Sequence, residues 1–211
     1  MKKHNTAEEF ARAKAECRSL FEKKLMDYGT SWRIMRPMSL TDQIMIKAMR
    51  IRSIEEKGVA LVDEGIRPEF IGIVNYCVMA LIQLELGPGE NLDADTCMRL
   101  YDEKLNGATR LMENKNHDYD EAWRHMRVSS FTDIILQKLM RTKEIEGHDG
   151  KTIVSEGLYK SIFAIIRPYN LIHQYILLFF FTYTLGTIKI KYNFSFCFYT
   201  KKDIMTNIKN M

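Results

Sequence analysis

The sequence predicts an all-α protein: two tandem copies of a three-helix module forming a helical bundle, followed by an atypical C-terminal tail. The main observation is a repeat at an offset of 91 residues. The stretches "KLMDYGTSW" (24–32) and "KNHDYDEAW" (115–123) share Lys, Asp, Tyr and Trp, and "SLTDQIMIKAMR" (39–50) matches "SFTDIILQKLMR" (130–141). Agreement without a gap over about fifty residues, Trp and Tyr included, indicates a duplication rather than chance.

The repeat divides the chain into three parts: a first module (1–90), a truncated second module (91–157) and the tail (158–211). The second module is placed up to residue 157 because "IVSEG" still matches "LVDEG" of the first copy after a one-residue insertion. Beyond this point the similarity is lost. We therefore expect the second copy to lack the third helix.

The first helix is predicted from a capping signal near the N-terminus. Thr6 and Glu9 have the spacing of a capping box, in which each side chain bonds an unpaired backbone N–H of the first turn. The predicted helix continues to about residue 25. A loop with Gly and Pro follows over residues 27–38, and it holds Trp32.

The second and third helices have signals of different kinds. Ser39 and Asp42 repeat the capping spacing, as do Ser130 and Asp133 in the second copy, and they predict a helix that ends near residue 58 in the first copy. Pro68 occupies a favoured position for the start of a third helix, which should reach "GP" at 87–88. Apolar residues surround this helix on all sides, so it should be central and buried.

The distribution of charge and cysteine narrows the class of protein. Residues 158–211 hold seven of the 31 Lys and Arg but one of the 27 acids, leaving 24 and 26 in residues 1–157. This slightly acidic body argues against a nucleic-acid partner, because such a partner needs a basic face. Four widely separated cysteines without a C-x-x-C pair indicate reduced thiols in a cytoplasmic protein.

The tail has two interpretations. Residues 170–211 contain no Ala, Val, Arg or Glu, a composition expected of an A/T-rich segment that is frameshifted or recently replaced. Alternatively, residues 168–188 carry no Asp, Glu, Lys or Arg and are long enough to anchor the protein in a membrane. A mispaired core segment would explain the same apolar run.

A lysine on an apolar helix face is the most informative detail for function. Lys47 lies on the same predicted stripe as Ile44 and Ile51, and Lys138 takes this position in the second copy. Such an ammonium group needs an anionic partner. The candidate partners are the carboxylates repeated between copies: Glu64 and Glu156, or Asp27 and Asp118.

Two readings of these residues remain open. In the first, each lysine forms an internal ion pair that locks its module. In the second, cations hold a phosphate group and carboxylates hold a metal ion. The phosphate-binding residues would then be Lys47, Arg50, Lys138 and Arg141, and the metal ligands Asp27, Asp118, Glu64 and Glu156.

Aromatic residues in the loops also have two readings. Trp32 and Trp123 sit in polar loops beside Tyr28 and Tyr119, respectively, so they could stack on a nucleotide base. Alternatively, each Trp fills the core of its own module. Asp42 and Asp133 could be metal ligands, but their spacing favours helix capping.

In the quoted motifs the sequence resembles the family called nucleotide modification associated domain 1. The pattern K-N-x-D-Y-G-x-x-W, followed by I-x-x-K-x-x-R, E-S or E-G, and an N-Y pair in a helix, is matched over about residues 10–157. The N-Y pair is Asn75-Tyr76. The resemblance implies a role in nucleotide metabolism or base modification in bacteria and phages.

The layout of helices and carboxylates is also distantly similar to all-α nucleoside triphosphate pyrophosphatases. That likeness implies Mg²⁺-dependent hydrolysis, with Glu64 and Glu156 as catalytic residues. Where related modules often carry an Asp in the third helix, this chain has Gly72. The prediction is a protein that binds a nucleotide or deoxynucleotide, with Mg²⁺-dependent hydrolysis as one option. The alternative is a non-catalytic helical scaffold for a protein or nucleic-acid partner.

Overall fold

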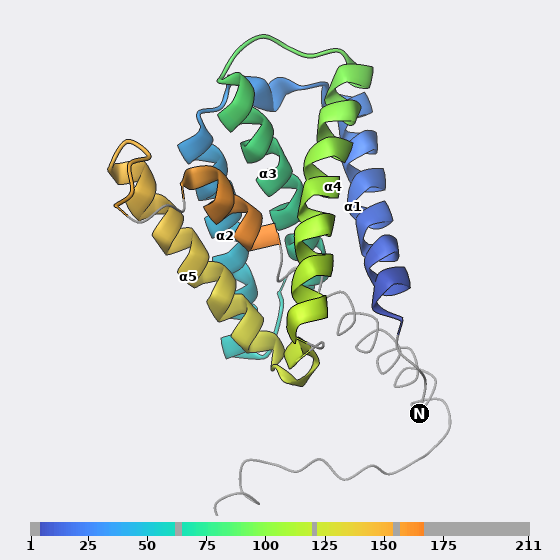
Figure 1. Ribbon diagram of the computed structural model, residues 1–211, viewed down its shortest axis with the longest axis vertical. Coiled ribbons are helices and arrows are strands. Elements are labelled where there is room, and N and C mark those ends of the chain that lie inside the picture. The colour runs from blue at the N-terminus through green and yellow to red at the C-terminus, as the bar shows by residue number, and fades with distance from the viewer. Residues whose placement is uncertain (1–4, 62–64, 120–121, 154–156, 167–211) are drawn as a thin grey trace, which may run out of the picture. The chain divides into compact units, whose positions relative to one another are not determined.

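The computed structural model describes residues 5–61, 65–119, 122–153 and 157–166, all of which belong to one structural unit, Met1–Ile176. The described part of the chain is helical, with two short 3₁₀ turns, which confirms the all-α prediction (Figure 1). Its elements are α1 (Thr6–Tyr28), η1 (Ser31–Ile34), α2 (Pro37–Lys57), α3 (Arg67–Leu86), α4 (Ala94–Tyr119), η2 (Ala122–His125) and α5 (Val128–Gly147). Residues 158–166 form a further helical segment.

The helix starts differ from the capping predictions. Asn5 caps α1, its Oδ1 accepting from the N–H of Glu8 at 3.4 Å, so Thr6 does not form the predicted capping box. The α2 helix begins at Pro37, whose fixed φ suits the first turn, after Arg36, which makes no side-chain cap. Ser39 and Asp42, like Ser130 and Asp133, therefore lie inside helices, and their predicted capping role is wrong.

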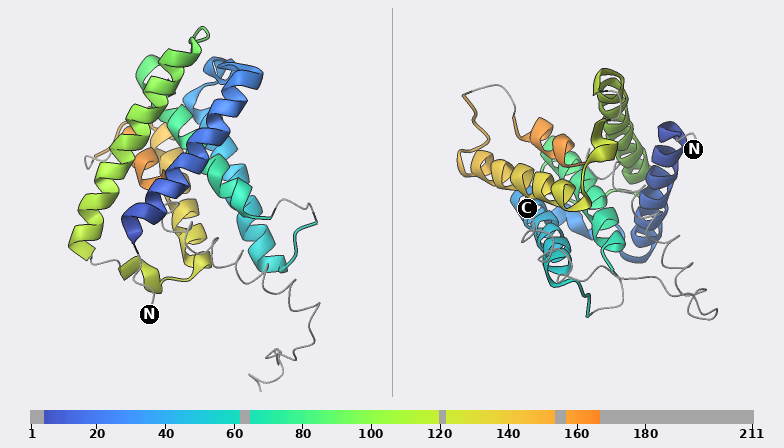
Figure 2. Two further views of the ribbon diagram at one scale, coloured as in Figure 1. Left: turned by 90° about the vertical axis from the view of Figure 1, so that its right-hand side faces the viewer. Right: turned by 90° about the horizontal axis from the view of Figure 1, so that it is seen from below.

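The third helix is central, as its composition predicted. Twelve residues of α3 are buried, on all sides of its axis. By length and composition α3 could span a membrane, but 67% of its apolar window is buried inside the bundle, as in the core helix of a globular protein. The α1 and α4 helices pack on one side of α3, and α2 packs on another (Figures 1 and 2). The membrane segment predicted at 168–188 lies outside the described residues.

The second copy extends beyond the predicted boundary at residue 157. Helical residues 158–166 follow α5 as α3 follows α2, and three of them, Ile162, Ile165 and Ile166, are completely buried in the common core. The expectation that this copy lacks its third helix was wrong at least for the first turns. The reason is that burial requires apolar residues at helical spacing, and these persist after the similarity to the first copy has faded.

The two copies pack against each other through equivalent helices with reciprocal contacts. Thr41 of α2 donates to Glu146 of α5 at 2.6 Å, and Thr132 of α5 donates to Glu55 of α2 at 2.9 Å. These two contacts exchange under the 91-residue offset, because Thr41 corresponds to Thr132 and Glu55 to Glu146. The α2 and α5 helices are therefore antiparallel and related by an internal two-fold axis, as in an isologous dimer interface.

Burial affects both interface carboxyl groups in the same way. Desolvation raises the pKa of Glu55 and of Glu146, while the threonine hydroxyl from the other copy opposes the shift. An aspartate of the other copy adds to each increase: Asp133 for Glu55 and Asp42 for Glu146. Asp42 also pairs with Lys143 at 2.7 Å. The electrostatic environment thus follows the internal symmetry.

Candidate functional site

The predicted cations of the first copy converge on one carboxylate. Lys47 Nζ lies 3.2 Å from Glu69 Oε2, and Arg50 donates to the other oxygen of the same group. Glu69 is in the first turn of α3, where a negative charge is favoured by the helix dipole, and its side chain is 9% exposed. The internal ion pair is thus present for Lys47, and its partner in the described structure is Glu69. Of the predicted partners, Asp27 is exposed in the last turn of α1, and Glu64 lies outside the described residues.

Gly72 provides the space in which Lys47 lies. A Cβ atom added at Gly72 would sit 2.7 Å from Lys47 Cε, closer than atoms can approach without a shift. One turn further along α3, the ring of Tyr76 lies 5.8 Å from Lys47 Nζ, a cation–π distance. The lysine stem therefore crosses α3 over a glycine, between Glu69 and Tyr76.

A hollow of about 230 Å³ lies beside this ion-pair cluster, at the C-terminal end of α2. Arg50, Ser53 and Lys57 provide its polar groups and recur at helical spacing, so they share one face of α2. The other lining residues are apolar: Ile54, Val59, Ala60 and Leu61. The hollow is somewhat smaller than the roughly 300–1,000 Å³ of typical ligand pockets, so it suits part of a small molecule.

The charge of this region favours an anion. Glu69 neutralises one of the two cations that contact it, and Lys57 adds an exposed ammonium on the same face. A guanidinium has five N–H donors, and the bond to Glu69 involves the NH1 nitrogen of Arg50. Glu69 can therefore hold Arg50 in place while other donors of the same group bind a phosphate oxygen.

The second copy has the corresponding cations but not the carboxylate. With the one-residue insertion, Glu69 corresponds to Ser161, which is buried and bonded to Thr142 at 2.7 Å. Lys138 is half-buried, and within the described ranges no carboxylate pairs with it. Arg141 is exposed. The two copies have therefore diverged at the position that organises the first site.

The predicted metal ligands are not brought together in the described structure. Asp27 lies in the last turn of α1 and Asp118 in the last turn of α4. The bonds Lys14–Asn106 and Arg18–Asp102 show that these helices are antiparallel, so the aspartates lie near opposite ends of helices of roughly 35 Å. Both are exposed.

Glu64 and Glu156 lie outside the described residues, so the structure does not place the predicted catalytic pair. Among the residues that are described, no group of three or more His, Cys, Asp and Glu side chains could hold a metal ion. Mg²⁺ prefers several oxygen ligands in an octahedral arrangement. The described carboxylates do not provide this arrangement.

The two tryptophans pack inside the bundle. Trp32 in η1 and Trp123 in η2 are 9% and 8% exposed, which favours the core-filling reading over base stacking. An arginine follows each tryptophan in the sequence, and the guanidinium of Arg124 lies 4.4 Å from the ring centroid of Trp123. Tyr28 is exposed at the end of α1. The side chain of Tyr119 lies outside the described structure.

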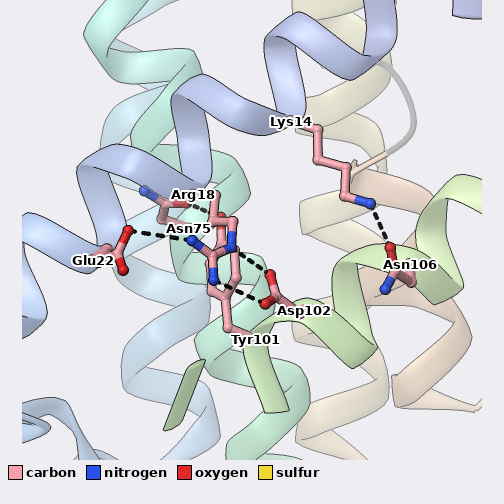
Figure 3. A network of polar contacts seen from close by, with 7 residues as sticks. All are labelled: Lys14, Arg18, Glu22, Asn75, Tyr101, Asp102 and Asn106. Atoms are coloured by element: carbon pink, nitrogen blue, oxygen red, sulfur yellow. Dashed lines mark hydrogen bonds and ion pairs between the residues drawn. The ribbon is translucent and has the colours of Figure 1, made fainter. Parts of the chain in front are cut away.

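A buried polar network joins helices of both copies (Figure 3). Tyr101 of α4 donates to Asn75 Oδ1 at 2.8 Å, and Asn75 Nδ2 donates to the carbonyl of Cys17 in α1 at 3.2 Å. At the edge of this network, Arg18 forms two bonds to Asp102, at 2.8 and 3.1 Å. The network satisfies the mid-helix asparagine and identifies Asn75 as a structural residue.

Sequence reasoning missed Glu69, Ser53 and Lys57, and it noted Gly72 only as a position where related modules often carry an Asp. The signal for Glu69 was its place immediately after Pro68 in the first turn of an otherwise apolar helix, where it is the sole acid before Glu85. The signal for the hollow was the spacing of Arg50, Ser53 and Lys57. Neither signal identifies a partner without knowledge of how α2 and α3 pack.

Fold and site together define a class: a tandemly duplicated all-α bundle with internal two-fold symmetry and a cationic hollow on its first copy. Comparison with known families assigns the chain more closely, because the model of nucleotide modification associated domain 1 matches residues 24–84 and 115–173. These segments cover more than half of the chain, and the chain belongs to this family. The second match includes the helical residues 158–166, in agreement with the longer second copy. No curated protein and no solved structure matches the chain.

Proposed function

We propose that this protein binds a nucleotide or deoxynucleotide through its phosphates, at the hollow beside Arg50 and Lys57. The observation that supports the proposal most is the ion-pair cluster around Glu69. Glu69 contacts both Lys47 and Arg50, and its single negative charge neutralises one of these two positive charges. The apolar wall formed by Ile54, Val59 and Leu61 gives the sugar or base a surface on which to pack. Membership in a family associated with nucleotide modification is consistent with such a ligand.

The proposal covers binding and not hydrolysis. The described carboxylates do not fit Mg²⁺, so no reaction step is assigned to a metal ion. Within the proposal, Arg50 binds phosphate and is held by Glu69, Lys57 adds charge from the end of α2, and Ser53 offers a hydroxyl between them. Lys47 supports the position of Glu69 from the other side.

A non-catalytic scaffold is the second candidate function. The observation that favours it is that polar groups inside the bundle already have partners: Lys47 pairs with Glu69, and Asn75 accepts a hydrogen bond from Tyr101. Both tryptophans are also buried. Under this reading the two copies share their polar residues because the fold requires them. The partner would be a protein, because the body of the chain has no basic excess for nucleic acid.

One experiment separates the two functions. Titration of the purified full chain with a panel of nucleoside and deoxynucleoside triphosphates, in EDTA and in Mg²⁺, should give heat of binding for at least one ligand in EDTA. Lys57→Gln, an exposed substitution, should weaken this binding about tenfold, as expected for one charge-assisted contact. If no ligand of the panel gives heat of binding or a shift of the melting temperature, the scaffold function is supported and the nucleotide-binding proposal is refuted. Release of pyrophosphate in Mg²⁺ would add hydrolysis to the proposal.

A further inference from the structure

We infer that the chain has one phosphate-binding site and not two, because the second copy has lost the features that form the site in the first. The inference rests on the proposed function and adds its stoichiometry and location. The duplication makes the inference testable, since each residue of the first site has a defined counterpart. The α2 and α5 helices are related by the internal two-fold axis, so these counterparts occupy equivalent positions in their copies.

The polar face of the hollow loses positive charge in the second copy. Ser53 corresponds to Glu144, which is exposed and lies between the counterparts of Arg50 and Lys57 along α5. A carboxylate at this position repels a phosphate and offers the neighbouring Arg141 an internal counter-charge one turn away. Together with the replacement of Lys57 by His148, which is neutral in the formal charge count, this substitution removes the net positive charge of these three positions.

The end of the helix changes as well. Lys57, with its ammonium group, is replaced by His148, and Gly58 is replaced by Asp149. Asp149 adopts a positive φ of 55°, as Gly58 does at 68°, so the backbone turns similarly while a further carboxylate is introduced. Two acids therefore replace two uncharged residues on or beside the face that binds phosphate in the first copy.

The carboxylate that contacts both cations of the first copy is also replaced in the second copy. Glu69, which holds Lys47 and Arg50, corresponds to Ser161, and this serine is bonded to Thr142 instead. Gly72 corresponds to Ala164, so a methyl group occupies the space over which the lysine stem passes in the first copy. Lys138 consequently lacks the acid and the gap that fix Lys47. We conclude that the first copy binds and the second serves as its symmetric packing partner.

The test exchanges single residues between equivalent positions in the full chain. Calorimetric titration with inorganic tripolyphosphate and with the best triphosphate of the panel should give one site per chain. Ser53→Glu, which transfers the acid of the second copy, should weaken binding at least about tenfold. The matched change Glu144→Ser should leave the affinity of this site within about twofold. Circular dichroism melting confirms that both variants are folded, and both positions are accessible enough to accept the change.

A second pair of variants keeps the result independent of Ser53. Lys57→Glu should abolish measurable binding, and His148→Glu should leave it unchanged. Two equal sites in the unaltered protein, or loss of binding on His148→Glu, would overturn the single-site inference while nucleotide binding stood. No heat with either ligand would overturn the proposed function and the inference together.

Discussion

The reciprocal contacts between α2 and α5 predict that two distant substitutions have the same effect on stability. Thr41→Val and Thr132→Val each remove a hydroxyl that donates to a half-buried glutamate of the other copy, at 2.6 and 2.9 Å. Both threonines are 1% exposed, so water cannot replace the lost donor. Valine has nearly the same shape, and packing should be preserved.

The expected loss follows from the geometry. A hydrogen bond to a charged group contributes about 1.5–3 kcal/mol; because Glu146 and Glu55 keep partial contact with solvent, we expect about 1–2 kcal/mol for each substitution. The two contacts are separated by roughly 20 Å along α2. At this distance the effects should add, and the double variant should lose about 2–4 kcal/mol.

Urea denaturation followed by tryptophan fluorescence provides the assay, because Trp32 reports on the first copy and Trp123 on the second. Thr109→Val is the matched control: its hydroxyl bonds the carbonyl of Leu105 in its own helix, so its loss should change the free energy of unfolding by less than about 0.5 kcal/mol. A loss above 1 kcal/mol for one interface threonine, with none for the other, would refute the symmetric interface. Strong non-additivity would do the same.

Three further predictions concern pH, the glycine gap and thiol reactivity. Burial raises the folded-state pKa of Glu55 and Glu146 above about 4.5. The stability that these two groups contribute is therefore present below that pH and is lost as pH rises through the folded pKa. In the double variant Glu55→Gln/Glu146→Gln, the free energy of unfolding should depend less on pH above 4.5 and should be no lower at pH 7. Gly72→Ala should displace Lys47 and reduce to near zero the coupling between this lysine and the carboxylate it contacts, as measured by a double-mutant cycle. Burial raises the pKa of Cys97 to about 11, so peptide mapping after alkylation at pH 8 should show slow modification in the native protein and fast modification in urea.

The sequence determined the architecture because the repeat and the helical periodicity are local properties. The offset of 91 residues predicted two equivalent modules, and the apolar run from Pro68 predicted a central helix, as observed in α3. Periodicity also placed Lys47 on the same stripe of α2 as Ile44 and Ile51. These conclusions need the geometry of a single helix and no knowledge of its neighbours.

Tertiary structure decided the partners. Periodicity fixes the direction of a side chain around its own helix, but the packing of α3 against α2 determined that Lys47 meets Glu69. The same holds for the reciprocal bonds of Thr41 and Thr132, which depend on an antiparallel arrangement of two equivalent helices. Contacts between elements depend on crossing angle and loop path, and neither is encoded in the spacing of residues along one helix.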